Sequence, residues 1–256
     1  MFRSFSRSDA LYLCSSAQKA DGDGTVSVHS HDSSLPVSDK LSRVSGYLGR
    51  AKFVFPAPDR ILDIVVALAA LVFVAPLMFF IGIFVMLSSP GPILFRQERL
   101  GRGGRTFSCL KIRTMRIDSD ALLDKLLADD SAARAEWDRD RKLRSDPRVF
   151  AVGHFLRRTS LDELPQLINV LVGDMSIVGP RPIVAAEAVR YRRYITAYFA
   201  VRPGITGLWQ VSGRNHTTYR RRVACDVVYV RAKSAGNDLR IMAMTVPTVL
   251  LARGAY

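Results

Sequence analysis

Two adjacent carboxylates, Asp162 and Glu163, lie at the start of a predicted short helix, and Arg157 lies just upstream of them. Ser160 and Glu163 fit a capping box, and acidic side chains in a first helical turn complement the helix dipole. Alternatively, a helix start with arginines around it can bind a phosphate group, and an ionised Asp162 there can act as a nucleophile. For one such segment taken alone the cap is the commoner outcome, so the choice depends on the rest of the chain.

Two loops rich in proline and glycine follow, at residues 173–182 and 202–215. They hold Arg181, Arg202 and Arg214 at defined positions, because proline restricts φ while glycine lets backbone N–H groups come close to a ligand. A guanidinium group offers a planar, bidentate fork to phosphate oxygens. Ordinary turns with solvated arginines are the alternative, but two such loops so close in the chain favour a rigid site for a diphosphate.

The chain has 256 residues, a mean hydropathy of +0.11 and a formal net charge of +14, and these properties come from different segments. Residues 101–256 hold 27 Lys or Arg and 15 Asp or Glu, so they carry +12 of the excess. Such a basic domain needs an anionic partner, which could be nucleic acid, an anionic membrane surface or a phosphorylated substrate. The arginines lie in Pro/Gly loops rather than along one helix face, and this arrangement argues against nucleic acid.

The apolar residues concentrate in an uncharged run of 24 residues at 64–87, long enough for a membrane helix, which needs about 20. Pro76 divides this run into two arms, each reaching only about half of a ~30 Å hydrocarbon core. Basic residues flank both ends, so the positive-inside rule favours the cytosolic face for both. The pattern predicts a re-entrant, broken helix, and a single span with a mild proline kink is the alternative left open.

The remaining segments predict a helix-rich α+β fold around this membrane segment. A small β-hairpin is expected from strand-like runs at 92–97 and 106–113, joined by a glycine-rich turn at 101–104. Helices are expected at residues 118–143, 162–172, 183–199, 218–233 and 238–253. The last helix, apolar along much of its length, lies either in the membrane interface or in the core.

Three regions follow from these patterns. Residues 1–50 are rich in serine and poor in aliphatic side chains, which predicts a disordered leader. Residues 51–90 form the membrane-inserted segment, and residues 91–256 form a cytosolic catalytic domain with amphipathic interfacial helices.

The motifs and their order resemble the bacterial sugar transferases, also called monotopic phosphoglycosyl transferases, of the type that initiates exopolysaccharide synthesis. The resemblance runs from about Arg60 to the C-terminus, and four blocks carry it: residues 111–115, 160–164, 173–182 and 202–215. Together their order and spacing are highly specific, although any one block alone is weak. Ala75 precedes Pro76 where many members have serine, and alanine cannot bond a carbonyl freed by the proline, so the break in the helix is less sharply specified.

The resemblance implies an activity and the residues that perform it. A hexose 1-phosphate, with galactose or glucose favoured, would pass from a UDP-sugar to undecaprenyl phosphate with release of UMP. Asp162 would be the nucleophile that carries the phosphosugar covalently, and Glu163 would be a catalytic residue that binds Mg²⁺. The expected location is the bacterial inner membrane, with the catalytic domain facing the cytosol. A second copy of the chain, or the glycosyltransferases that act later, would be its protein partners.

Phosphoryl transfer depends mainly on positioning and charge neutralisation, for which the site needs a metal and several cations around one nucleophile. The predicted substrate-binding residues are Lys111, Arg113, Arg157, Arg181, Arg202 and Arg214. Their division between the nucleotide and the lipid phosphate is left open by the sequence. Two other functions also stay open: a glycosyltransferase that releases UDP, and a membrane-tethered basic module that binds anionic lipid or nucleic acid without catalysis.

Overall fold

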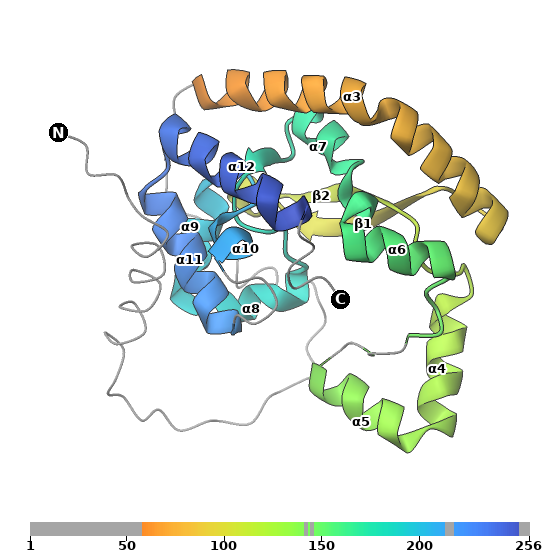
Figure 1. Ribbon diagram of the computed structural model, residues 1–256. Helices are drawn as coiled ribbons and strands as arrows, with labels where there is room; N and C mark the ends of the chain where they lie inside the picture. Colours follow the sequence, from red (N-terminus) through yellow and green to blue (C-terminus); the bar gives the residue numbers. More distant parts are fainter. Residues whose placement is uncertain (1–57, 141–142, 144–145, 213–217, 251–256) are drawn as a thin grey trace, which may run out of the picture.

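The computed structural model describes residues 58–140, 143, 146–212 and 218–250. The predicted leader at residues 1–50 lies outside the described residues. The helices are α3 (Pro58–Ser88), α4 (Ser119–Asp129), α5 (Ser131–Asp140), α6 (Ala151–Thr159), α7 (Gln166–Val172), α8 (Ala188–Tyr191), α9 (Ile195–Ala200), α10 (Leu208–Ser212), α11 (Tyr219–Arg231) and α12 (Ala235–Leu250). The strands are β1 (Leu94–Leu100), β2 (Thr106–Ile112), β3 (Ser176–Val178) and β4 (Gly204–Thr206). The prediction of a helix-rich α+β fold with one long apolar helix is confirmed (Figure 1).

Three of the predicted helices are interrupted. The one predicted at 162–172 begins as a 3-10 turn, Leu161–Glu163, and becomes α-helical only at Gln166. The segment predicted at 118–143 divides into α4 and α5, because the Asp130 carboxylate accepts the backbone N–H groups of Ala132 and Ala133 and so begins a new helix. The segment predicted at 183–199 divides into short α- and 3-10 helices, and Arg192 there has a positive φ of 48°. Interruptions of this kind depend on local caps and dihedrals that apolar periodicity does not report.

The predicted hairpin is confirmed, since β1 and β2 pair antiparallel with Leu94 opposite Ile112 and Leu100 opposite Thr106. Side chains alternate between the two faces of a strand, and directly paired residues share a face. Arg99 on β1 therefore lies on the same face as Lys111 on β2, four residues away along the pairing. The register brings a second cation to the face that carries one of the predicted site residues.

The two Pro/Gly loops meet at a second, parallel pair of strands, with Ser176 opposite Gly204 and Val178 opposite Thr206. Beyond the strands the backbones stay joined, because Gly204 N–H donates to the Pro180 carbonyl at 2.8 Å and Gly179 N–H to the Thr206 carbonyl at 2.8 Å. A Cβ at Gly179 or Gly204 would clash with backbone atoms of the opposite loop. Glycine is required here so that the two loops can touch.

Helix α3 is the one helix in the described part of the chain that is long and apolar enough, by length and composition, to cross a membrane. It runs unbroken through Pro76, so the predicted break is instead a bend within one helix, and Figure 1 shows α3 curving along one side of the domain. Its outer face is exposed and apolar, with Phe73 85% and Leu87 79% exposed. The re-entrant path through a membrane stays a prediction.

Polar contacts join both ends of α3 to the same domain. Near its start, the Asp63 carboxylate accepts hydrogen bonds from Ser176 Oγ at 2.8 Å and Ile177 N–H at 2.9 Å. Just after its end, Arg113 on the segment following β2 donates to the Ser89 carbonyl at 2.6 Å. Between these points Ala67 and Val85 are fully buried, in clusters shared with α7 and α6 respectively. The helix is thus fastened to the domain along both halves.

Helix α12 contributes to the core, one of the two places the sequence allowed for it. Ile241 is buried in one cluster with Trp209 and Tyr229, and the helix also contacts α3, β3 and β4. On another side of the helix, Val246 is 59% exposed. A membrane-interface position for that side stays a prediction.

Candidate active site

The carboxylate pair lies in a single 3-10 turn, Leu161–Glu163, between α6 and α7. Ser160 ends α6 in the left-handed region, with φ 59° and ψ 18°, and its side chain makes no capping hydrogen bond. The Glu163 carboxylate accepts from two cations instead of reaching back to the backbone of Ser160. The capping-box interpretation is therefore wrong, and the second interpretation, a charged site, is the one that the geometry favours.

Glu163 forms the centre of an ion-pair network. Its Oε1 atom accepts from Lys111 Nζ at 2.7 Å and from Arg181 at 3.1 Å, and these cations come from β2 and from the first Pro/Gly loop. Burial alone would raise the pKa of Glu163, but Arg181 and Lys111 outweigh burial and lower that pKa to about 2. Glu163 is consequently ionised throughout the physiological pH range.

Asp162 differs from its neighbour in having no hydrogen bond from any other described group to its carboxylate. Burial raises the pKa of Asp162, the negative charge of Glu163 raises it further, and the nearby cations offset this only in part, giving about 6. The carboxylate is mostly ionised at neutral pH but poorly stabilised in that form. An ionised oxygen without hydrogen bonds, beside cations, has the properties of a nucleophile.

Arg157 is the third cation near Asp162. Its Nε donates to Thr114 Oγ1 at 2.9 Å, which orients the guanidinium from the last turn of α6. Arg157 is also among the charges that lower the pKa of Asp162, together with Lys111 and Arg181. The structure thus brings together five of the predicted residues around one turn: Asp162, Glu163, Lys111, Arg157 and Arg181.

The structure places the other predicted cations elsewhere. Arg113 is buried, and its guanidinium donates to the Pro92 carbonyl at 2.7 Å as well as to both Ser89 oxygens, so it holds the end of α3 against β2. Arg202 donates to the Gly173 carbonyl at 2.9 Å, and burial and the charges of Arg102 and Arg60 lower its pKa. Neither lies at the carboxylate pair, and Arg214 lies outside the described residues.

A small pocket opens beside Glu163, lined by Arg99, Cys109, Lys111, Glu163, Gln166, Arg181, Pro182, Gly204 and Ile205. Two polar lining residues, Arg99 and Gln166, are absent from the set predicted from sequence. Period-two alternation in the hairpin would have placed Arg99 on the face of Lys111 once the register was known. Gln166, the first residue of α7, carried no sequence signal that separated it from ordinary helix positions.

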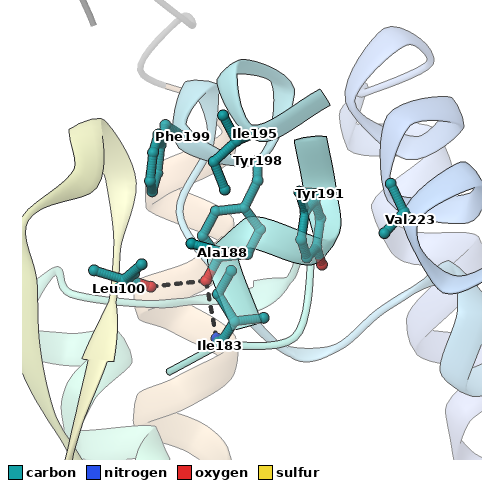
Figure 2. Close-up of a cluster of buried hydrophobic side chains, with 8 residues drawn as sticks. All are labelled: Leu100, Ile183, Ala188, Tyr191, Ile195, Tyr198, Phe199 and Val223. Atoms are coloured by element: carbon teal, nitrogen blue, oxygen red, sulfur yellow. Dashed lines mark hydrogen bonds between the residues drawn. The ribbon is translucent and has the colours of Figure 1, made fainter. Parts of the chain in front are cut away.

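Tyr198 on α9 holds the two walls of this pocket together. Its hydroxyl donates to the Leu100 carbonyl at 2.7 Å and accepts from Ile183 N–H at 3.2 Å, as the dashed lines in Figure 2 show. Leu100 follows Arg99, and Ile183 comes two residues after Arg181. The buried hydroxyl therefore bridges the strand that carries one arginine and the loop that carries the other.

Replacing Tyr198 with phenylalanine is expected to lower the free energy of unfolding by about 1–3 kcal/mol, because a buried carbonyl and a buried N–H would both lose their partner. Chemical denaturation of the detergent-solubilised protein measures this. Tyr194→Phe is the matched control, since among the described residues that hydroxyl accepts one hydrogen bond, from the exposed Arg193 at 2.9 Å. Its effect should stay within about 0.5 kcal/mol. Equal effects of the two substitutions would contradict the bridging role.

The donor set at the turn fits a magnesium ion shared with substrate. No group of three or more His, Cys, Asp or Glu side chains suited to a metal occurs among the described residues. Mg²⁺, however, is commonly held by only one or two carboxylates together with substrate phosphates and water. Glu163 Oε1 is taken by the two cations, whereas no described group donates to Oε2, which leaves one carboxylate oxygen for such an ion.

A family model described as "Bacterial sugar transferase" matches residues 56–252, more than half of the chain. The chain belongs to the bacterial sugar transferase family. The family resemblance found in the sequence motifs is thereby confirmed, and the matched segment contains α3, the hairpin, the carboxylate turn and both Pro/Gly loops of this chain.

Three curated proteins illustrate what this family member is similar to. The undecaprenyl-phosphate galactose phosphotransferase of Salmonella typhimurium is 48% identical over 197 residues, which are 77% of this chain and 41% of that protein. The exopolysaccharide production protein ExoY of Rhizobium meliloti is 45% identical, over 77% of this chain and 87% of its own length. The UDP-glucose:undecaprenyl-phosphate glucose-1-phosphate transferase of Caulobacter vibrioides is 42% identical, over 77% of this chain and 71% of its own length. The chain spans about two fifths of the Salmonella relative's length.

Proposed function

We propose that this protein transfers a hexose 1-phosphate from a UDP-sugar to undecaprenyl phosphate, as the first step of exopolysaccharide or other glycan assembly. The observation that carries the proposal is the Asp162 carboxylate, which accepts no hydrogen bond from the described residues. It lies beside the Glu163 carboxylate and three cations, and these four groups belong to four different elements. The relatives named for galactose and glucose phosphate transfer to undecaprenyl phosphate support the same substrate classes. Galactose and glucose are accordingly the sugars to test first.

The reaction would proceed in two displacements at phosphorus. In the first, an Asp162 oxygen attacks the phosphorus that bears the sugar, the bond from that phosphorus to the UMP oxygen breaks, and UMP leaves with the bonding electrons. In the second, an oxygen of undecaprenyl phosphate attacks the same phosphorus and displaces Asp162. Lys111, Arg157 and Arg181 neutralise the phosphoryl oxygens during both steps, and Mg²⁺ held by Glu163 would supply further neutralisation of the diphosphate.

One assay tests the reaction class and the sugar together. The detergent-solubilised protein is incubated with Mg²⁺, undecaprenyl phosphate and one member of a panel of UDP-sugars, and the released nucleotide is identified. We expect UMP with UDP-galactose or UDP-glucose. Release of UDP would mean transfer of the sugar without its phosphate, and no nucleotide release from any donor would favour a non-catalytic module that binds anionic lipid or nucleic acid.

The membrane part of the proposal is that α3 enters the inner leaflet and returns to the cytosolic face. A helix that crossed to the far side would separate one of its ends from the catalytic domain, yet Asp63 and Ser89, close to opposite ends, both bond to that domain. The exposed apolar face between them would then contact lipid. The homodimer and the later glycosyltransferases stay predictions, as does the sugar itself.

We expect a cysteine placed before Ile61 and one at Pro90 to react with a membrane-impermeant thiol reagent from the cytosolic side only. Inverted and right-side-out membrane vesicles distinguish the two sides. Val72→Cys is the control, because this position is 69% exposed in the structure but would lie in lipid, and it should react from neither side. Labelling of the two flanking positions from opposite sides would overturn the re-entrant path.

A further inference from the structure

The pocket beside Glu163 contains more positive charge than the carboxylate pair requires. Arg99, Lys111 and Arg181 line it against the single carboxylate of Glu163. Lys111 and Arg181 are already ion-paired with Glu163, at 2.7 and 3.1 Å. The third cation, Arg99, has only a distant carboxylate partner in the described structure, Glu187, with an N···O separation of 4.0 Å. An unbalanced positive charge in a partly buried pocket favours an anionic ligand.

One hydrogen-bond donor of the Arg99 guanidinium has no partner in the described structure. Its two terminal nitrogens donate to the Pro182 carbonyl at 3.0 Å and to Gln97 Oε1 at 2.6 Å, which fixes the plane of the guanidinium. Its Nε is buried and has no partner in the described structure. Burial and the charge of Arg181 both lower the pKa of Arg99, so its positive charge is poorly compensated. An orphaned buried donor costs free energy unless a ligand satisfies it.

Gln166 supplies a second polar side chain to the same pocket. The residue is only 2% exposed and lines the pocket together with Arg99. Its side-chain amide can donate as well as accept a hydrogen bond. Arg99 and Gln166 reach the pocket from the hairpin and from α7, two elements joined at the Asn169 side chain, which accepts from Leu110 N–H at 2.9 Å and donates to the Ser108 carbonyl at 2.8 Å.

We propose that this pocket binds the phosphate group of the departing nucleoside monophosphate, with Arg99 and Gln166 as its additional donors. The inference rests on the proposed function, which makes UMP the leaving group. Glu163 lines the pocket while its neighbour Asp162 does not, so the pocket adjoins the reacting phosphorus without containing the nucleophile. A leaving phosphate gains negative charge as its bond to phosphorus breaks, and preset arginine donors stabilise that charge. A neutral sugar would make no use of the excess positive charge.

The test measures binding of three probes to the full chain in detergent micelles with Mg²⁺, by calorimetry: UMP, uridine and farnesyl phosphate. Arg99→Gln should raise the Kd for UMP at least tenfold and leave the Kd for uridine unchanged, because only the phosphate loses a partner. Gln166→Leu should raise the Kd for UMP several-fold. The control is Arg105→Gln, which removes an exposed charge from the turn of the same hairpin and should change the Kd less than twofold.

A further variant separates ligand binding from a structural role, since Arg99 also supports the Pro182 carbonyl. Glu187→Gln leaves Arg99 in place but removes the nearest carboxylate, so UMP should bind two- to threefold more tightly, an effect that damage to the fold would not produce. The inference is overturned if Arg99→Gln leaves the Kd for UMP within twofold of the wild-type value. It is also overturned if the substitution raises the Kd for uridine as much as the Kd for UMP, or raises the Kd for farnesyl phosphate alone. Wild-type protein that binds no UMP would instead refute the proposed donor class.

Discussion

Asp162→Asn is expected to lower turnover of the UDP-sugar by at least about 10⁴-fold, because the amide cannot attack phosphorus or carry the phosphosugar. The variant should fold normally. Burial raises the pKa of Asp162 above that of an unfolded aspartate, so its ionised form is disfavoured in the folded state, and this destabilisation grows as the pH rises through about 6. Removing the charge should therefore leave stability at pH 7 unchanged or higher. Activity lost without stability lost is the expected pattern.

The covalent step can be observed directly in the absence of lipid acceptor. Wild-type protein incubated with the UDP-sugar and Mg²⁺ should gain the mass of one phosphohexose and release one equivalent of UMP, whereas Asp162→Asn should do neither. Asp124→Asn, an exposed carboxylate on α4, is the matched control and should behave as wild type. Normal turnover by Asp162→Asn would refute the covalent mechanism. If Asp162→Asn is inactive but the wild-type protein forms no phosphohexose adduct, the phosphosugar is transferred directly.

Glu163→Gln is expected to lower kcat by about 10²-fold or more and to raise the Mg²⁺ concentration for half-maximal activity, because the one negative charge of Glu163 holds two cations and would also hold the metal ion. Glutamine keeps the shape and one acceptor oxygen but not the charge, so Lys111 and Arg181 would repel each other and lose their fixed positions. Turnover measured across a Mg²⁺ titration gives both quantities in one experiment.

Glu98→Gln is the control for this substitution, since Glu98 is an exposed carboxylate on β1 and its loss should change neither quantity. If Glu163→Gln lowers kcat but leaves the Mg²⁺ requirement unchanged, Glu163 does not bind the metal ion and acts by positioning the cations. A Glu163→Gln variant with the rate and the Mg²⁺ dependence of the wild-type protein would refute both the metal-binding and the positioning role.

Local patterns were enough for the parts of the fold that depend on neighbours in the chain. The long apolar helix over the uncharged run at 64–87, the hairpin and a short helix ending at Val172 were predicted, because hydrophobic run length, alternation and turn residues are local properties. The order of the motifs also indicated the family. The continuity of α3 was not predicted: the helix runs unbroken through Pro76, and both of its halves pack on the domain.

The sequence by itself determined the chemical types at the site: two adjacent carboxylates, and loops that supply arginines. Only the tertiary structure decided which cations meet them. Arg113 and Arg181 are the same residue type and were both predicted to bind substrate, yet Arg113 donates to the Ser89 and Pro92 carbonyls while Arg181 donates to Glu163. Arg99, which no motif distinguished, enters the pocket because the hairpin register and Tyr198 place it there. The physical reason is that a guanidinium bonds whichever acceptors the fold brings within reach, and spacing along the chain does not report those distances.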